Sequence, residues 1–190
     1  MKDLETYKSI IRPFLGEKRF YHSVCVSEAA VELAKKYGAN EEKAAVAGIL
    51  HDIMKDTPSD EQLKMMTRYD IILSDVERRA PKLWHAILGE AYLEQELKIS
   101  DHDILDAVRY HTTARANMSL LEKVLFIADF ISADRDYTGV ENMRRAAKVS
   151  LEEAMVEGLT FNIKDLASGY KPIHPDTISA YNQVVVMYKS

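Results

Sequence analysis

Six residues of the types that bind metal ions lie in apolar, helix-forming stretches of this 190-residue chain. They are His22, His51, Asp52, His85, His111 and Asp129. Imidazole and carboxylate groups are costly to bury in apolar surroundings unless a partner compensates them, and a bound cation does so. A ligand set without thiolate is typical of iron, manganese or another borderline divalent ion rather than of structural zinc.

The densest part of this set is segment 51–56, His-Asp-Ile-Met-Lys-Asp, which directly follows an apolar run. If the segment is helical, His51 and Lys55 lie one turn apart, and so do Asp52 and Asp56. Taken alone, the His-Asp pair is better explained as a hydrogen-bonded helix end. Lys55 could contact a phosphate oxygen and Asp56 could act as an orienting base, or both could belong to a solvated helix end.

The other four candidates have a similar context. His22 is expected at the start of a helix, His85 on a helix that follows a proline, and His111 at the end of a third helix. A lone histidine on an amphipathic helix is usually a hydrogen-bonded core residue. Asp129, however, interrupts the apolar run 124–131, where an acid needs a partner inside the protein. Together the set predicts a metal centre in a helical bundle.

Further polar residues could bind the anionic part of a phosphorylated substrate. A guanidinium pairs with phosphate through two hydrogen bonds, which makes Arg19, Arg115 and Arg135 candidates, although a surface role explains each equally well. The hydroxyls of Thr112 and Thr113 either donate to a phosphate or simply finish a helix. Because the chain has no glycine-rich phosphate-binding loop, metals and side chains would have to hold a polyphosphate.

The elements that position these residues are expected to be helices. No stretch alternates convincingly between apolar and polar residues, so the prediction is an all-α fold with roughly eight to ten helices joined by short loops. Gly38 should close the helix that begins near His22, and Asn40 should cap the next one. Capping boxes are predicted at Ser59–Gln62, Ser74–Glu77 and Ser119–Glu122, and first helical residues at Pro81 and Pro175.

Composition and organisation favour one globular domain over residues 1–190, since no repeat, linker or low-complexity tract interrupts it. The metal-binding core is expected at about 18–133, with C-terminal helices over 141–188 packing on it. A net charge of −5 gives no broad cationic surface for nucleic acid or anionic membranes. The apolar runs are too short to cross a bilayer, and the lone Cys25 forms no intrachain disulfide, which favours a cytoplasmic protein.

The order His, His-Asp, His, His, Asp resembles that of the HD-domain superfamily of metal-dependent phosphohydrolases. A closer match extends from about Lys2 to the last helix. It is carried by the segments 18–22 (KRFYH), 47–52 (AGILHD), 55–56 (KD), 111–113 (HTT), 118–123 (MSLLEK), 128–129 (AD) and 171–177 (KPIHPDT), with Arg135 and the pair 139–140 (GV). Within the superfamily, these segments are most similar to the bacterial YqeK family of symmetrical bis(5′-nucleosyl)-tetraphosphatases. Two departures are Ala114, where a glycine is expected, and the absence of a proline-containing turn after His85.

The resemblance implies two divalent metal ions, with iron expected and manganese or another ion as alternatives. One ion would be held by His22, His51, Asp52 and Asp129, and the second by His85 and His111, with Asp52 bridging the two. The implied activity is symmetrical hydrolysis of diadenosine tetraphosphate to two ADP. Asp52 is expected to be catalytic, and Lys55 and Asp56 are the further catalytic candidates from segment 51–56.

Three alternatives stay open. The first is an HD phosphohydrolase for another nucleotide, such as a dNTP, a guanosine polyphosphate or a cyclic nucleotide. The second is a non-catalytic nucleotide or metal sensor on the same scaffold. A helical interaction module with unrelated histidines ranks last. The expected partner is a nucleotide or dinucleoside polyphosphate, without nucleic acid or membrane, and a homodimer is possible.

Overall fold

The computed structural model describes residues 2–188, and within this range it contains only helices and their connections, which confirms the all-α prediction. The described residues form eleven α-helices, slightly more than expected, and one short 3-10 helix. They are α1 (Leu4–Ile11), α2 (Glu17–Tyr37), α3 (Glu41–Leu50), α4 (Ser59–Arg68), α5 (Asp75–Arg79), η1 (Pro81–Leu83), α6 (Trp84–Gln95), α7 (His102–Tyr110), α8 (Leu120–Ile131), α9 (Val140–Val149), α10 (Leu151–Ser168) and α11 (Pro175–Tyr188).

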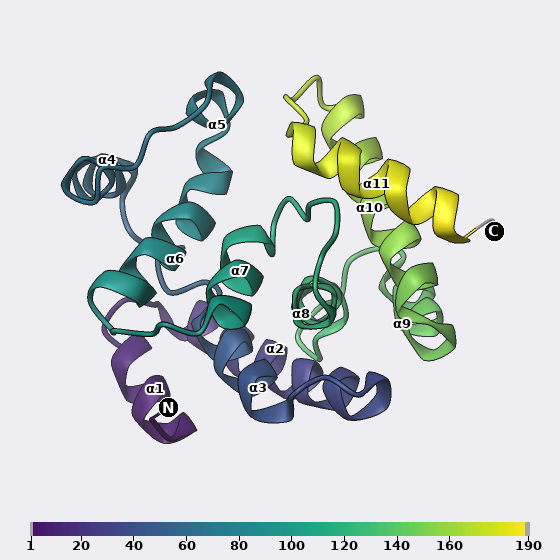
Figure 1. Ribbon diagram of the computed structural model, residues 1–190, viewed down its shortest axis with the longest axis horizontal. Helices are drawn as coiled ribbons and strands as arrows, with labels where there is room; N and C mark the ends of the chain where they lie inside the picture. Colours follow the sequence, from purple (N-terminus) through teal and green to yellow (C-terminus); the bar gives the residue numbers. More distant parts are fainter. Residues whose placement is uncertain (1, 189–190) are drawn as a thin grey trace.

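Helix α8 lies at the centre of the arrangement (Figure 1), with α2 and α3 on one side, α6 and α7 on another, and α9 to α11 on a third. Its sequence explains this position. Five consecutive residues of α8, Val124 to Ala128, are fully buried, so the helix is apolar around most of its circumference. An acid that follows this run, Asp129, is therefore carried into the interior of the bundle.

Helices α2 and α3 approach each other closely at Gly48. A Cβ atom on Gly48 would lie 2.5 Å from Cα of Ser27, so no larger residue fits without moving the backbone. The hydroxyl of Ser27 also donates to the Ala45 carbonyl across this contact. The close crossing brings His22 of α2 next to His51, which follows α3, with ring centroids 5.4 Å apart.

Most of the predicted helix ends are confirmed. Capping boxes are present at Ser74 of α5 and Ser119 of α8, and Asn40 caps α3 by accepting from the amide of Lys43. The predicted box at Ser59 is wrong, because Ser59 is already the first residue of α4, and Gln62 donates instead to the Met54 and Thr57 carbonyls. Gly38 ends α2 in the left-handed conformation, Pro175 starts α11, and Pro81 opens η1 rather than α6.

The C-terminal helices lie beside the central helix. Both α9 and α10 pack on α8, and α11 packs on α10. Figure 1 shows α10 and α11 on the opposite side of the molecule from α4 to α6. The extent of a metal-binding core and of a single domain stays a prediction. None of the helices in the described range is both long and apolar enough to span a membrane.

Candidate metal centre

The structure brings all six candidate metal ligands to the same region. His22 lies in the second turn of α2, His51 and His111 are the C-terminal caps of α3 and α7, and His85 lies in the first turn of α6. Asp52 follows His51, and Asp129 lies in α8. The four histidines and Asp52 are buried, whereas the Asp129 side chain is 22% exposed. The site is thus formed where several helix ends meet.

Segment 51–56 departs from its prediction because it is a series of turns, not a continuation of the helix. Helix α3 ends at Leu50, and the backbone then makes short turns, such as the bond from the Lys55 amide to the Asp52 carbonyl. As a result Lys55 and Asp56 do not form the two helical rows that their spacing suggested.

The two carboxylate oxygens of Asp52 face different pairs of histidines. Its Oδ1 lies 3.1 Å from Nε2 of His85 and 3.6 Å from Nε2 of His111. Its Oδ2 lies 3.5 Å from Nε2 of His51 and 4.0 Å from Nε2 of His22. One carboxylate therefore stands between two groups of imidazoles.

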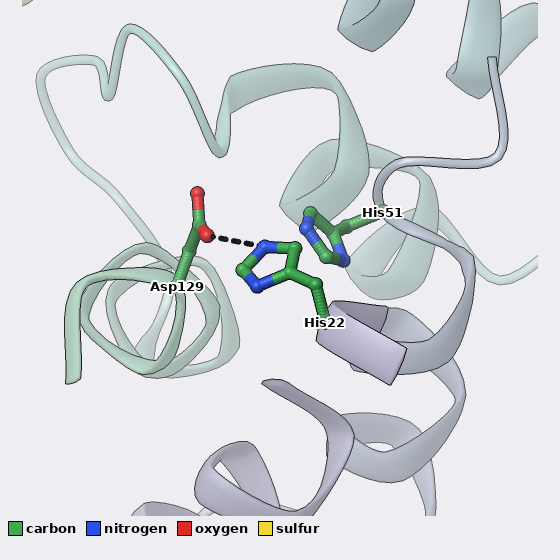
Figure 2. A group of neighbouring side chains, drawn as sticks. All are labelled: His22, His51 and Asp129. Carbon is green, nitrogen blue, oxygen red and sulfur yellow. Dashed lines mark ion pairs between the residues drawn. The ribbon is translucent and has the colours of Figure 1, made fainter. Parts of the chain in front are cut away.

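Asp129 belongs to the second of these groups. Figure 2 shows the His22 ring turned toward the Asp129 carboxylate, with His51 beside it, and the Nε2–Oδ1 distance is 3.0 Å. The side chains of His22, His51 and Asp129 place ligand atoms within 4.8 Å of one another. A second such set joins His51, Asp52 and His111, with Nε2 of His85 only 3.2 Å from Nε2 of His111.

The orientation of the imidazoles suits metal binding. Nδ1 of His51 lies 2.7 Å from the Gly48 carbonyl, and Nδ1 of His111 lies 2.7 Å from the Val108 carbonyl. Because a carbonyl oxygen only accepts, each Nδ1 carries the hydrogen, and the neutral ring then has its lone pair on Nε2. In both residues this Nε2 is the atom that faces Asp52.

Asp134 orients His22 in the same way, and sequence reasoning did not find it. Its Oδ2 lies 2.7 Å from Nδ1 of His22, while its Oδ1 accepts from the hydroxyl of Ser132 at 2.8 Å. The Nε2 lone pair of His22 then faces the carboxylate of Asp129. Since the two partners are 112 residues apart, no local spacing in the sequence could signal the pair.

The donor atoms of the six candidate ligands are arranged as a cation requires. Nε2 of His51 is buried and has no hydrogen-bond partner among the described residues. Imidazole lone pairs facing carboxylates repel each other unless a positive charge lies between them, and a buried acceptor without a donor is costly. Divalent metals bound by nitrogen and oxygen ligands remove both costs, so the donor set fits such an ion.

Three cationic side chains surround the acids. Arg19 donates to Oδ2 of Asp52 at 2.8 Å, Arg135 donates to the Asp129 carboxylate, and Nζ of Lys55 lies 3.3 Å from Nε2 of His85. Burial raises the pKa of Asp52 and Asp129, but the polar and charged groups around the two acids, including Arg135 for Asp129, hold both well below their usual range. Both acids are therefore anionic at neutral pH.

Burial acts in the opposite direction on the basic groups. It lowers the pKa of the Lys55 ammonium and lowers that of His85 to about 4. A neutral His85 keeps a lone pair available for coordination. Asp56, the remaining acid of the segment, accepts at 2.9 Å from the amide of Gly16, which caps α2.

Two cavities adjoin the acids and share Arg135. The first, here called the basic cavity, has a volume of about 450 Å³ and is lined by Lys18, Arg19 and His22 among others. The second, here called the aromatic cavity, has a volume of about 380 Å³. It is lined by His111, Thr112, Asp129, Phe130, Arg135, Tyr137, Phe161 and Asn162. Each cavity thus contains at least one candidate ligand and one shared guanidinium.

Arg115 is not brought to this cluster. Its guanidinium pairs with Glu122 at 2.6 Å and with Asp106 at 2.9 Å, and it lies over the Tyr110 ring. None of these contacts supports the predicted phosphate-binding role. Thr113 is buried, and its carbonyl accepts from the hydroxyl of Thr177.

The chain is similar to known proteins over the range that contains all six candidate ligands. Residues 19–134 match the model of the HD domain family. The chain is 40% identical over 180 residues to a protein of Halalkalibacterium halodurans named bis(5′-nucleosyl)-tetraphosphatase, symmetrical, covering 95% of this chain and 96% of that one. A Bacillus subtilis protein of the same name is 37% identical, covering 92% of this chain and 94% of that one.

A crystal structure from Clostridium acetobutylicum, described as a predicted HD superfamily hydrolase involved in NAD metabolism, superposes with a TM-score of 0.93. It is 35% identical, and the match covers 98% of this chain and 99% of that one. The chain therefore belongs to the HD-domain superfamily of metal-dependent hydrolases and, within it, to the YqeK-type family of symmetrical bis(5′-nucleosyl)-tetraphosphatases.

Proposed function

We propose that this protein hydrolyses diadenosine tetraphosphate symmetrically to two molecules of ADP. The observation that carries the proposal is the position of Asp52 between two groups of imidazoles, one facing each carboxylate oxygen. This is the arrangement expected of a bridging ligand between two cations. The names of the Halalkalibacterium and Bacillus relatives supply the substrate class, a bis(5′-nucleosyl) tetraphosphate that is cleaved symmetrically.

The residues that we propose as ligands follow the two groups. His22, His51, Asp52 and Asp129 would hold one ion, and His85 and His111 a second, with Asp52 shared. Iron is the proposed metal, and manganese and other divalent ions are the alternatives. When bound, a pair of such ions would lower the pKa of a water held between these residues and would neutralise charge that develops on the phosphate.

The chain's own cations would bind the polyphosphate. Arg135 lines both cavities, so its guanidinium can hold a phosphate near the middle of the substrate while one ADP half extends into each cavity. Arg19 and Lys55 lie beside Asp52 and can bind the phosphates next to the central anhydride. Cleavage of that anhydride consumes one water and yields two equal products.

Asp56 is proposed to orient the water and accept its proton. One of its oxygens is fixed by the amide of Gly16, and the side chain lines the basic cavity together with His22 and Arg19. The bond from Gly16 therefore holds the carboxylate in one orientation at the edge of the metal centre. Thr112 lines the aromatic cavity, and its hydroxyl is a further candidate for donating a hydrogen bond to a phosphate oxygen.

A second candidate is an HD hydrolase that acts on a nucleotide of NAD metabolism, because the Clostridium structure is described in those terms. The two candidates use the same metal centre and differ only in the nucleotide bound. They must be separated by products rather than by geometry.

The deciding experiment measures the metal content of protein purified without chelator, together with the chromatographic products from diadenosine tetraphosphate. We expect about two metals per chain and ADP as the sole product. Formation of AMP and ATP would contradict symmetrical cleavage. Absence of turnover in metal-loaded protein would reject this substrate, and the same assay with NAD-related nucleotides, dNTPs and cyclic nucleotides would then identify the alternative.

A further inference from the structure

A third cavity continues from the aromatic cavity away from the metal centre. It has a volume of about 180 Å³, and we call it the distal cavity. It shares Thr112 and Asn162 with the aromatic cavity. Its walls come from α5 and η1 on one side and from α10, α11 and their connecting loop on the other. Figure 1 shows these two parts of the chain facing each other.

The walls of the distal cavity are mainly apolar. Pro81, Leu83, Leu166 and Pro172 line it, as expected for a site that takes a flat ring rather than a phosphate. Its volume is smaller than the roughly 300–1,000 Å³ of pockets that enclose a whole drug-sized ligand. It therefore suits one ring system at the end of a larger molecule.

Two polar groups in this lining have no partner among the described residues. The Thr113 side chain is 2% exposed, and its hydroxyl forms no hydrogen bond. The Asn162 side chain forms none either, and it stands where the two cavities join. A buried hydroxyl without a partner is unfavourable, which points to a ligand that supplies one. An asparagine amide offers a donor and an acceptor side by side, which matches the edge of adenine.

The charge at the cavity favours an anionic molecule. Arg79, Lys82 and Lys171 line it, and no acid does. Within residues 2–188, Arg79 and Lys82 form no ion pair, while Nζ of Lys171 lies 3.7 Å from an exposed acid. Unpaired cations beside apolar walls attract a ligand that carries negative charge next to a ring.

We infer that the distal cavity binds a nucleobase of the substrate, with Asn162 as a specificity-determining residue that hydrogen-bonds to the base edge. This inference rests on the proposed function for the identity of the substrate. The phosphates must lie at the metal centre, where His111 and Asp129 line the aromatic cavity. The base is the part of an ADP half that is farthest from the cleaved anhydride, so it reaches the cavity beyond Asn162, and the ribose lies against Phe161 or Tyr137.

The inference can be tested by a substitution that fills the distal cavity, made at a partly exposed position of α10. Leu166→Trp places a large ring in the cavity, and Lys164→Trp is the matched control, because Lys164 is exposed on the same helix and lines none of the cavities. Calorimetry on manganese-loaded protein would measure the binding of ADP and of methylenediphosphonate, which has the two phosphorus groups but no base.

We expect Leu166→Trp to weaken ADP binding about tenfold or more, as for the loss of a base contact, and to leave diphosphonate binding unchanged. Lys164→Trp should change neither. Asn162→Ala provides a second test in case the tryptophan disturbs folding, and it should weaken ADP binding while sparing the diphosphonate. Unchanged ADP binding in a folded Leu166→Trp protein, or equal loss of both ligands, would overturn the inference.

Failure of the proposed function and failure of the base-site inference give different results. The binding comparison requires no turnover, so a wild-type protein that leaves diadenosine tetraphosphate intact would reject the proposed function alone. Hydrolysis of that substrate with the same KM in wild type, Leu166→Trp and Asn162→Ala would reject the base site alone.

Discussion

Asp134 holds His22 by a hydrogen bond of 2.7 Å between its Oδ2 and Nδ1 of the ring. The opposite nitrogen, Nε2, faces the carboxylate of Asp129 at 3.0 Å. The imidazole is thus fixed between two acids from the C-terminal end of α8 and the loop that follows it. A carboxylate behind a ligating histidine fixes its tautomer and raises its basicity.

Replacing Asp134 should therefore weaken metal binding without removing a ligand. Asp134→Ala should lower affinity about 10- to 100-fold, and Asp134→Asn should lower it less, because its amide oxygen can still accept from Nδ1. Titration of chelator-treated protein with manganese would measure this effect. Asp136→Asn, an exposed acid two residues later, is the control. Equal affinities in Asp134→Ala and the control would show that His22 needs no support.

Asp52→Ala should abolish hydrolysis and remove bound metal while the helices remain. Among residues 2–188, the Asp52 carboxylate alone faces both groups of imidazoles, whereas the core around α8 is apolar and does not depend on it. Metal analysis, product analysis and circular dichroism on the same preparation would check the three parts. An active Asp52→Ala protein would remove the basis of the proposed mechanism.

The two groups of ligands predict different metal stoichiometries. His85→Ala or His111→Ala should reduce the content from about two ions toward one, because the four ligands proposed for the first ion, His22, His51, Asp52 and Asp129, are all retained. His22→Ala should instead lower the affinity of the first ligand set for its ion. Metal analysis after gel filtration would compare the variants. Retention of both ions in His85→Ala and His111→Ala would contradict the assignment of a second site.

The sequence predicted well what depends on local chemistry. Each capping box at Ser74 and Ser119 is contained within four residues, so its pattern is visible in the chain. The six candidate ligands stood out because ionisable groups in apolar helices need a partner, whichever residue supplies it. Ala114, where the resemblance favoured glycine, has a φ of 56°, the left-handed conformation that glycine adopts readily.

Features that depend on where the chain turns, or on contacts between distant residues, could not be predicted from the sequence. Asp134 resembles any loop acid until the fold sets it beside His22. The turns after α3 depend on the packing of a short segment between helices, so the helical rows assigned to Lys55 and Asp56 were wrong. The choice among arginines was equally nonlocal, because Arg115 and Arg135 have the same chemistry and differ only in their neighbours.

Tyr69 offers a test by pH that is independent of the metal centre. Its hydroxyl donates to Glu96 at 3.0 Å, and burial, followed by this bond, raises the pKa of Tyr69 to about 12. The folded protein then keeps a proton that the unfolded chain loses above about pH 10. The stability from this group is complete below pH 10 and falls as the pH rises toward 12. Between pH 9 and 11, about one unit either side of the free tyrosine value, the free energy of unfolding should fall less in Tyr69→Phe than in wild type. Urea unfolding at several pH values would measure this difference. An identical loss in both proteins would contradict the shift.

Arg115→Ala separates a structural arginine from a substrate-binding one. Its guanidinium neutralises Glu122, which is 1% exposed and also accepts from the amide of Ser119. Removing it leaves a buried carboxylate with fewer partners, so the free energy of unfolding should fall by about 2 kcal/mol. KM for diadenosine tetraphosphate should stay unchanged in folded protein. Arg145→Ala, an exposed position on α9, is the control and should change neither quantity. A raised KM with unaltered stability would return Arg115 to the substrate site, because only a phosphate contact would then account for its effect.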